Sequence, residues 1–214
     1  MIKAVNTIRL IILAAFFLLP FGLKSQNLSS FKKLTPPEKR WVIFHPLIAK
    51  KVYKISIKAK NIADSLISDT SFDGDKNGGQ IDAFRHTIWM AMLSQKYNWR
   101  KIYKLGLAHE KGNYYQYKKH KTEDGTLPDK ISSEMDLLNN DAGRQIGMDN
   151  KNASLDSLIN IVKQNVLSGN LWIIKKNKKG EFLDQYNNVI NADSLKGKWE
   201  NNKVIVKSNF LIKN

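Results

Sequence analysis

The sequence predicts a mainly α protein, a single helical domain of about five helices with a small C-terminal β-hairpin or sheet. Apolar residues recur at helical spacing over several segments of the chain. Prolines, glycines and capping residues separate those segments. Short runs of β-branched and aromatic residues follow near the C-terminus. We therefore expect a leader at 1–25, a helical domain at 26–170 and a β appendage at 171–214.

The first 25 residues have the pattern of a secretory signal peptide. Lys3 and Arg9 precede an apolar run over residues 10–19, and a small residue, Ser25, stands at the expected cleavage end. This run is about half the length that crosses a bilayer. We expect export to the periplasm or the medium, with no transmembrane span in the mature protein. The alternative is an uncleaved N-terminal anchor.

The helices are expected in a defined order. A first helix begins at Pro36 with Thr35 as its cap, and Pro46 interrupts and restarts it. Further helices are expected over about 47–67, 81–97, 99–117, 132–147 and 154–167. The 47–67 helix carries lysines on its outer face. This pattern favours a packing helix with a solvated face, and a membrane-surface role is the alternative.

The C-terminal tail has a different pattern. Residues 171–174 and 181–183 flank a turn rich in Lys, Asn and Gly, which predicts a β-hairpin. Residues 203–207 are typical of a further strand. We therefore expect a small β appendage on a helical body.

Composition limits the classes of function and partner. The chain has no cysteine, which excludes disulfides and thiolate metal sites. Its net charge is +16, but the lysines are dispersed and no nucleic-acid-binding motif is visible. Specific nucleic-acid binding is therefore disfavoured, and the expected partner is an unidentified substrate such as a lipid or another envelope component. Arginines are few in this lysine-rich chain, and they mark positions where a planar fork of donors is needed.

Two polar blocks lie where helices would normally face a core. In the first, Asp82 and His86 are four residues apart and share one helix face, with Arg85 within reach. An Asp at this spacing can orient an imidazole and raise its basicity. The second block is His109 and Glu110. Adjacent helical positions point about 100° apart, so both side chains can border one pocket but cannot point straight at one atom.

A third block comprises Asp136, Asn139, Asn140, Gly143 and Arg144. Asp136 and Asn140 share one helix face, and Asn139 and Gly143 share the next. Glycine within a helix is destabilising by about 1 kcal/mol relative to alanine. Such a glycine usually allows another helix or a ligand to approach closely.

Together the three blocks resemble an uncharacterised bacterial domain family. That family occurs in secreted proteins and at the C-termini of some large exported or toxin-like proteins. Its signature, D-x-x-R-H, then A-H-E, then M-D-x-x-N-N-x-x-G-R, covers roughly residues 78–147 here. The resemblance implies that these residues form one site, and it implies no particular reaction.

The residue types suit a divalent metal bound by nitrogen and oxygen ligands, with Zn and Ca as candidate ions. The expected metal ligands are His86, His109, Glu110 and Asp136. The expected catalytic residues are His86, His109, Glu110 and Asp82, and the expected substrate-binding residues are Arg85, Asn139, Asn140 and Arg144. One hypothesis is a metal-dependent or His-based hydrolase of ester or phosphodiester, lipid-like substrates. The alternative is a non-catalytic exported binding or structural domain whose polar residues form a buried network.

A loop before the first block resembles part of a calcium site. Asp73, Asp75 and Asn77 match the first half of an EF-hand-type loop, D-x-D-x-N-G. The twelfth position of that template is Phe84 rather than Glu. The loop is thus a candidate calcium site, and the alternative is a turn that caps the next helix.

Overall fold

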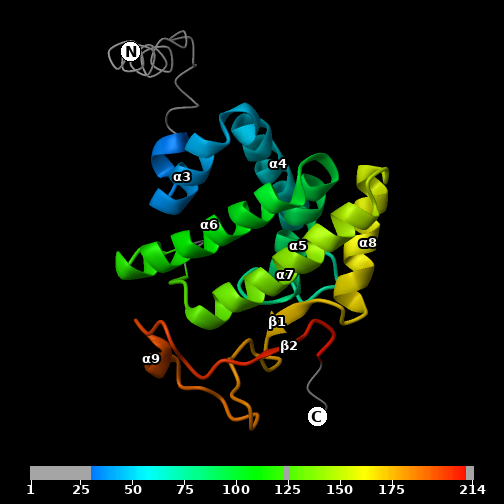
Figure 1. The fold of residues 1–214 in the computed structure, drawn as a ribbon. Coiled ribbons are helices and arrows are strands. Elements are labelled where there is room, and N and C mark those ends of the chain that lie inside the picture. The colour runs from blue at the N-terminus through cyan, green and yellow to red at the C-terminus, as the bar shows by residue number, and fades with distance from the viewer. Residues whose placement is uncertain (1–29, 123–125, 211–214) are drawn as a thin grey trace, which may run out of the picture. The chain divides into compact units, whose positions relative to one another are not determined.

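The computed structural model describes residues 30–122 and 126–210, and the leader predicted at 1–25 lies outside them. Contacts divide the chain into two units, Met1–Leu34 and Thr35–Asn214. The described helices of the second unit are α3 (Pro36–Phe44), α4 (Pro46–Ser65), α5 (Gln80–Lys96), α6 (Trp99–Lys118), α7 (Lys130–Asp149), α8 (Leu155–Leu167) and the short α9 (Ala192–Leu195) (Figure 1). The prediction of a mainly helical protein is confirmed.

Local sequence sets the helix ends. Pro46 opens α4 directly after α3, because its missing N–H is not needed in the first helical turn. The helix α7 begins two residues before the expected start. The reason is Asp129, whose side chain accepts a 2.8 Å hydrogen bond from the backbone N–H of Ser132 and so caps the helix.

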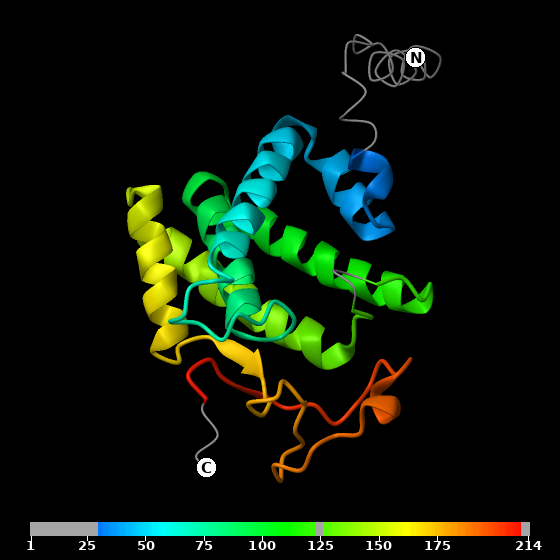
Figure 2. The same cartoon turned by 180° about the vertical axis from the view of Figure 1, so that it is seen from behind.

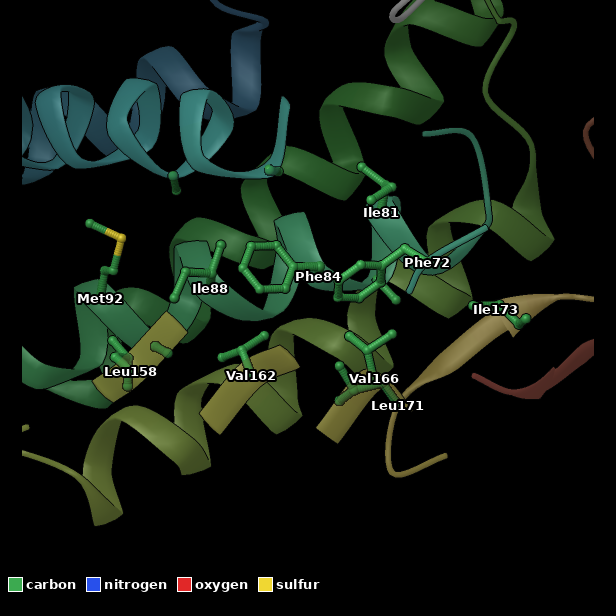
Figure 3. Close-up of a cluster of buried hydrophobic side chains, with 14 residues drawn as sticks. Phe72, Ile81, Phe84, Ile88, Met92, Leu158, Val162, Val166, Leu171 and Ile173 are labelled. Atoms are coloured by element: carbon green, nitrogen blue, oxygen red, sulfur yellow. The ribbon is translucent and has the colours of Figure 1, made fainter. Parts of the chain in front are cut away.

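Helix α5 is the centre of the fold. It contacts α4, α6, α7, α8 and β1 (Trp172–Ile174), and twelve of its seventeen residues are buried. Phe84 and Ile88 on α5 are fully buried and belong to one cluster with Leu158 and Val162 of α8 (Figure 3). Burial of each such side chain stabilises the fold by about 2 kcal/mol. A helix buried on nearly all sides keeps its polar residues away from bulk solvent.

The small sheet differs from the expected hairpin. Strand β1 pairs antiparallel with β2 (Ile205–Lys207), with Ile173 opposite Val206. Residues 181–183 contribute only isolated bridges, from Phe182 to Lys176 and from Leu183 to Val189. The chain does fold back as a hairpin over the predicted turn, but the pairing begins just after β1: Lys176 bridges Phe182, and the Leu183 N–H donates a 3.1 Å hydrogen bond to the Lys175 carbonyl. Strand β1 itself pairs with β2. The prediction of a small C-terminal sheet is confirmed.

The loop before α5 lies beside β1 (Figure 2). The backbone N–H of Ile174 donates a 2.6 Å hydrogen bond to the carbonyl of Gly78. Gly78 has a φ of +88°, and a Cβ there would lie 2.8 Å from the Ile174 side chain. A glycine is needed at this position both for its backbone conformation and for its contact with β1. The loop thus fixes the first turn of α5 against the sheet.

Candidate functional site

The first turns of α5 present Asp82, Arg85 and His86. Asp82 lies near the helix N-terminus, where a negative charge is favourable, and its Oδ2 accepts a 2.7 Å hydrogen bond from the Gly78 N–H. His86 follows one turn later on the same face, as the spacing predicted. Asp82 is 5% exposed and His86 3%. Both side chains are therefore withdrawn from bulk water.

Helix α7 approaches α5 closely enough to complete the cluster. A Cβ at Gly143 would lie 2.3 Å from the carbonyl oxygen of Thr87, and one at Gly147 would lie 2.3 Å from that of Ala91. Only glycine permits this backbone-to-backbone contact. It brings Asp136, two turns before Gly143, to the α5 face that carries His86. The role anticipated for Gly143, which was to allow close approach, is confirmed.

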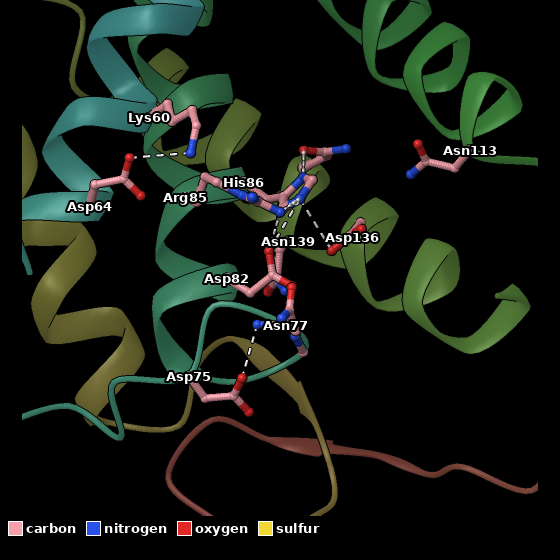
Figure 4. A network of polar contacts seen from close by, with 12 residues as sticks. Lys60, Asp64, Asp75, Asn77, Asp82, Arg85, His86, Asn113, Asp136 and Asn139 are labelled. Atoms are coloured by element: carbon pink, nitrogen blue, oxygen red, sulfur yellow. Dashed lines mark hydrogen bonds and ion pairs between the residues drawn. The ribbon is translucent and has the colours of Figure 1, made fainter. Parts of the chain in front are cut away.

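His86 is surrounded by oxygen atoms from both helices (Figure 4). Its Nε2 lies 3.5 Å from Oδ1 of Asp82 and 3.4 Å from Oδ1 of Asp136. Its Nδ1 lies 3.3 Å from Oδ1 of Asn140. An amide oxygen can only accept a hydrogen bond, so this contact favours the tautomer with the proton on Nδ1. In the neutral ring, Nε2 then presents its lone pair towards the two carboxylates.

Arg85 connects this cluster to solvent. Its Nη2 donates a 2.6 Å hydrogen bond to Oδ1 of Asp82 and lies 3.3 Å from Nε2 of His86. Its side chain is 21% exposed, against 7% for Asp82. The guanidinium therefore offsets the charge of Asp82 and lies at the accessible edge of the site, where it can bind an anionic group.

A second imidazole, His109 of α6, lies beside the first. The ring centroids of His86 and His109 are 6.1 Å apart, and Trp89 contacts both rings edge-on. Nδ1 of His109 lies 3.1 Å from Oε1 of Glu38 on α3, and the His109 side chain is 23% exposed. The structure thus places a His–carboxylate pair between the buried cluster and the surface.

Glu38 was not among the predicted site residues, and its contact with His109 is visible only in the structure. Glu38 stands three residues after Thr35 and completes a capping box, with Oε2 accepting from the Thr35 N–H at 2.8 Å. Burial would raise the pKa of this carboxyl. The hydrogen bond and charge of His109, together with the Thr35 bonds, outweigh burial and hold the pKa below its ordinary value of 4.5. Glu38 is therefore ionised and binds the imidazole of His109.

The potential metal ligands differ in part from those expected. Among the described residues, Asp82, His86 and Asp136 form a group of ligand atoms that all lie within 4.8 Å of one another. His109 and Glu110 were expected in such a set and are not members of this one. Glu110 is buried on α6, and its Oε2 accepts a 3.0 Å hydrogen bond from Asn113.

Two of the expected substrate-binding residues make contacts of another kind. The amide group of Asn139 pairs with the backbone of Trp172 in β1, donating at 2.9 Å and accepting at 3.0 Å. The guanidinium of Arg144 lies over the ring of Tyr103 and donates a 2.7 Å hydrogen bond to Asp141. These two side chains connect α7 to β1 and to α6.

The acidic loop is occupied by a side-chain cation. Both carboxylate oxygens of Asp73 accept from the Gln80 N–H, at 3.1 and 2.9 Å. Asp75 accepts from the Asn77 N–H at 2.9 Å and forms an ion pair with Lys176. The same ammonium donates a 2.7 Å hydrogen bond to the carbonyl of Asn77. Lys176 thus contacts two of the three residues that matched the template, Asp75 and Asn77.

In the described part of the chain, no helix combines the length and the apolar character that a bilayer crossing requires. Comparison of the sequence with curated proteins, and with solved structures, found no match. A family model described as a domain of unknown function, DUF6973, matches residues 39–170, which include α4 to α8 and all three polar blocks. The chain therefore belongs to the DUF6973 family.

Proposed function

We propose that this protein is a hydrolase that cleaves an ester or phosphodiester bond in a lipid-like substrate, at a divalent-metal centre held by Asp82, His86 and Asp136. The observation that carries the proposal is the spacing of the ligand atoms around His86. Tetrahedral coordination with bonds of about 2.1 Å places ligands about 3.4 Å apart. The two nitrogen–oxygen distances at His86 are 3.5 and 3.4 Å.

The surroundings of the ligands support the same assignment. Histidines that bind metals usually donate their second ring N–H to an oxygen acceptor, which fixes the tautomer. Asn140 is that acceptor for His86, at 3.3 Å. The Gly78 N–H orients Asp82 in a comparable way, at 2.7 Å. Two carboxylates and one imidazole are a mixed oxygen and nitrogen set, which suits zinc or manganese better than calcium.

The neighbouring residues have roles that follow from their positions. A bound divalent ion would lower the pKa of a coordinated water and supply hydroxide near neutral pH. Arg85, at the accessible edge, would bind the anionic part of the substrate. His109, oriented by Glu38, would transfer a proton to the leaving group. In this proposal the expected catalytic residues Asp82 and His86 bind the metal, His109 transfers a proton with Glu38 as its partner, and Glu110 has no assigned role.

Metal content and hydrolysis should be measured together on purified full-length protein. Asp136→Asn removes one proposed ligand, and Asp141→Asn is the matched control, since Asp141 is an exposed carboxylate on the same helix that pairs with Arg144. We expect about one zinc or manganese per chain in the wild type and in Asp141→Asn, and little in Asp136→Asn. Hydrolysis of bis(p-nitrophenyl) phosphate or a p-nitrophenyl ester should fall at least 100-fold in Asp136→Asn.

The competing hypothesis is a polar network that only stabilises the fold. It predicts no stoichiometric metal in any variant, no hydrolysis of either substrate, and a large loss of melting temperature in Asp136→Asn. That result would reject the hydrolase.

We also propose that the protein is exported and that its leader is removed. The support is the signal-peptide pattern of residues 1–25. N-terminal sequencing of protein from the periplasm or the medium should begin near residue 26. Recovery of the uncut chain from membranes would instead support the N-terminal anchor.

A further inference from the structure

Helix α4 follows α3 after a sharp corner (Figure 1), and three large apolar side chains at this corner are exposed to solvent. Ile43 is 60% exposed, Phe44 69% and Leu47 91%. They lie within five residues of one another at the end of α3 and the start of α4. Isolated exposed apolar residues are ordinary, but a contiguous group of this size is typical of an interaction surface.

Buried contacts hold the corner in place. Trp41 is 5% exposed, and its Nε1 donates a 3.0 Å hydrogen bond to the carbonyl of Lys101 on α6. The ring of Trp41 stacks on His45 at 4.5 Å, and Nδ1 of His45 hydrogen-bonds the Trp41 carbonyl at 2.8 Å. The three apolar side chains therefore project from a rigid turn that is anchored to the helical body.

The sequence from the end of α3 through most of α4 is rich in cations. Residues 39–63 contain seven Lys or Arg and no Asp or Glu. Arg40, Lys50, Lys51 and Lys54 are exposed, and the Arg40 guanidinium lies 6.0 Å from the centroid of the Phe44 ring. An apolar point surrounded by cations matches the boundary between the acyl chains and the anionic headgroups of a bilayer.

We propose that the corner formed by Ile43, Phe44 and Leu47 inserts into the interface of an anionic lipid membrane, while the surrounding Lys and Arg side chains bind the headgroups. Nucleic acid would use the cations but would leave the three apolar side chains in water. The proposal goes beyond the hydrolase and does not depend on it. If the hydrolase and the membrane proposal are both correct, the His109 side of the site would lie near the membrane, because its partner Glu38 is on α3 shortly before the corner.

The absence of cysteine allows a label at a single position of the full-length chain. Leu47→Cys carrying an NBD fluorophore reports on the corner. Tyr186→Cys carrying the same label is the control, because Tyr186 is 74% exposed on the C-terminal appendage. With phosphatidylglycerol vesicles we expect a blue shift and a several-fold rise in emission at position 47 and little change at 186. Phosphatidylcholine vesicles should produce much less change.

Paired substitutions separate the apolar and cationic contributions. Phe44→Ser with Leu47→Ser, and separately Lys50→Glu, Lys51→Glu and Lys54→Glu together, should each weaken the emission-monitored binding of the labelled corner at least tenfold. The variant with three Lys→Glu substitutions keeps the label at position 47. For the apolar set, the label is moved to Ile43→Cys.

Matched controls at exposed positions of the appendage should leave binding within about twofold. They are Tyr186→Ser with Val189→Ser, and Lys178→Glu, Lys179→Glu and Lys198→Glu together. An unchanged spectrum at position 47, or an equal response at 186 or with neutral vesicles, would overturn the proposal. So would binding to oligonucleotides that is stronger than binding to anionic vesicles. Melting curves confirm that each variant is folded.

Discussion

Two clusters of acidic side chains lie on either side of the start of α5, and they differ in what holds them. In the loop, Asp73 and Asp75 accept hydrogen bonds from backbone N–H groups, and the ammonium of Lys176 pairs with Asp75. In the cluster at His86, the carboxylates of Asp82 and Asp136 converge on an imidazole nitrogen.

An Asp-rich motif therefore does not by itself indicate a metal. Lys176, which follows β1, supplies a cation to the loop. The Asp73 carboxylate accepts from the Gln80 N–H at the start of α5, and the Asp75 carboxylate connects the loop to Lys176. The buried cluster instead gathers three ligand atoms, and second contacts orient two of the three residues: Asn140 orients His86, and the Gly78 N–H orients Asp82. Both clusters contact a side-chain cation, Lys176 in the loop and Arg85 at Asp82, so the difference between them is the buried imidazole with its second carboxylate, Asp136.

The largest loss of stability and of metal is expected on substitution of Asp82, which belongs to the buried cluster and also accepts a hydrogen bond from Gly78 of the loop. Asp82→Ala removes both the ligand and the acceptor of the Gly78 N–H, and it leaves Arg85 beside a buried imidazole. We expect a loss of about 3 kcal/mol in the free energy of unfolding, measured with urea, together with loss of metal. Asp82→Asn should lose the metal with a smaller change in stability. A stable, metal-loaded Asp82→Ala protein would contradict the proposed centre.

A smaller, purely structural effect is expected at Asp73. Asp73→Ala removes the acceptor for the Gln80 N–H at the start of α5 and should lower the free energy of unfolding by about 2 kcal/mol. Metal content in the remaining folded protein should equal that of the wild type. Loss of metal without loss of stability would mean that the loop, rather than the His86 cluster, binds the ion.

Substitution of the loop cation sharpens the comparison further. Lys176→Met removes the ion pair with Asp75 and should lower stability by about 1 kcal/mol. Because the carboxylates then lack their cation, millimolar calcium should raise the melting temperature of Lys176→Met and leave that of the wild type unchanged. A calcium-dependent rise in the wild type would show that the loop is a calcium site despite Lys176.

The smallest effect concerns pH and Glu38. The pKa of Glu38 is lower in the folded protein than its ordinary value of 4.5, so its ionised form stabilises the fold. That contribution is complete above pH 4.5 and is lost as the pH falls from there through the lower folded pKa. Glu38→Gln should therefore lose less stability than the wild type below pH 4.5 in urea titrations. Parallel pH profiles would argue against the ion pair with His109.

Much of the fold followed from local sequence signals. Apolar periodicity and capping residues located α5 and α6 to within one or two residues, because a helix depends on neighbours three and four positions away. The pairing of β1 with β2 joins residues more than thirty positions apart, and no local pattern records that choice. The local turn signal did predict the fold-back of 181–183 on 175–177, which the structure contains.

Contacts within one helix of the site were predictable from the sequence, and contacts between distant helices were not. The spacing of Asp82 and His86, and of Asp136 and Asn140, placed each pair on one helix face, and both pairs contact one another in the structure. The partnership of His109 with Glu38 joins α6 to α3 across 71 residues. The capping box with Thr35 already accounts for a glutamate at position 38, so the local sequence did not indicate that Glu38 also contacts His109.

Gly143 and Gly147 have a consequence for how this site can vary among related chains. Each abuts a main-chain carbonyl of α5, so the separation between Asp136 and His86 is limited by contact between two backbones. Where side chains set the distance between two helices, substitutions can change that distance in small steps. Here one added methyl group would push α5 and α7 apart and would move Asp136 away from His86. The backbone contact therefore restricts these two positions to glycine, although neither glycine contributes a side chain to the cluster.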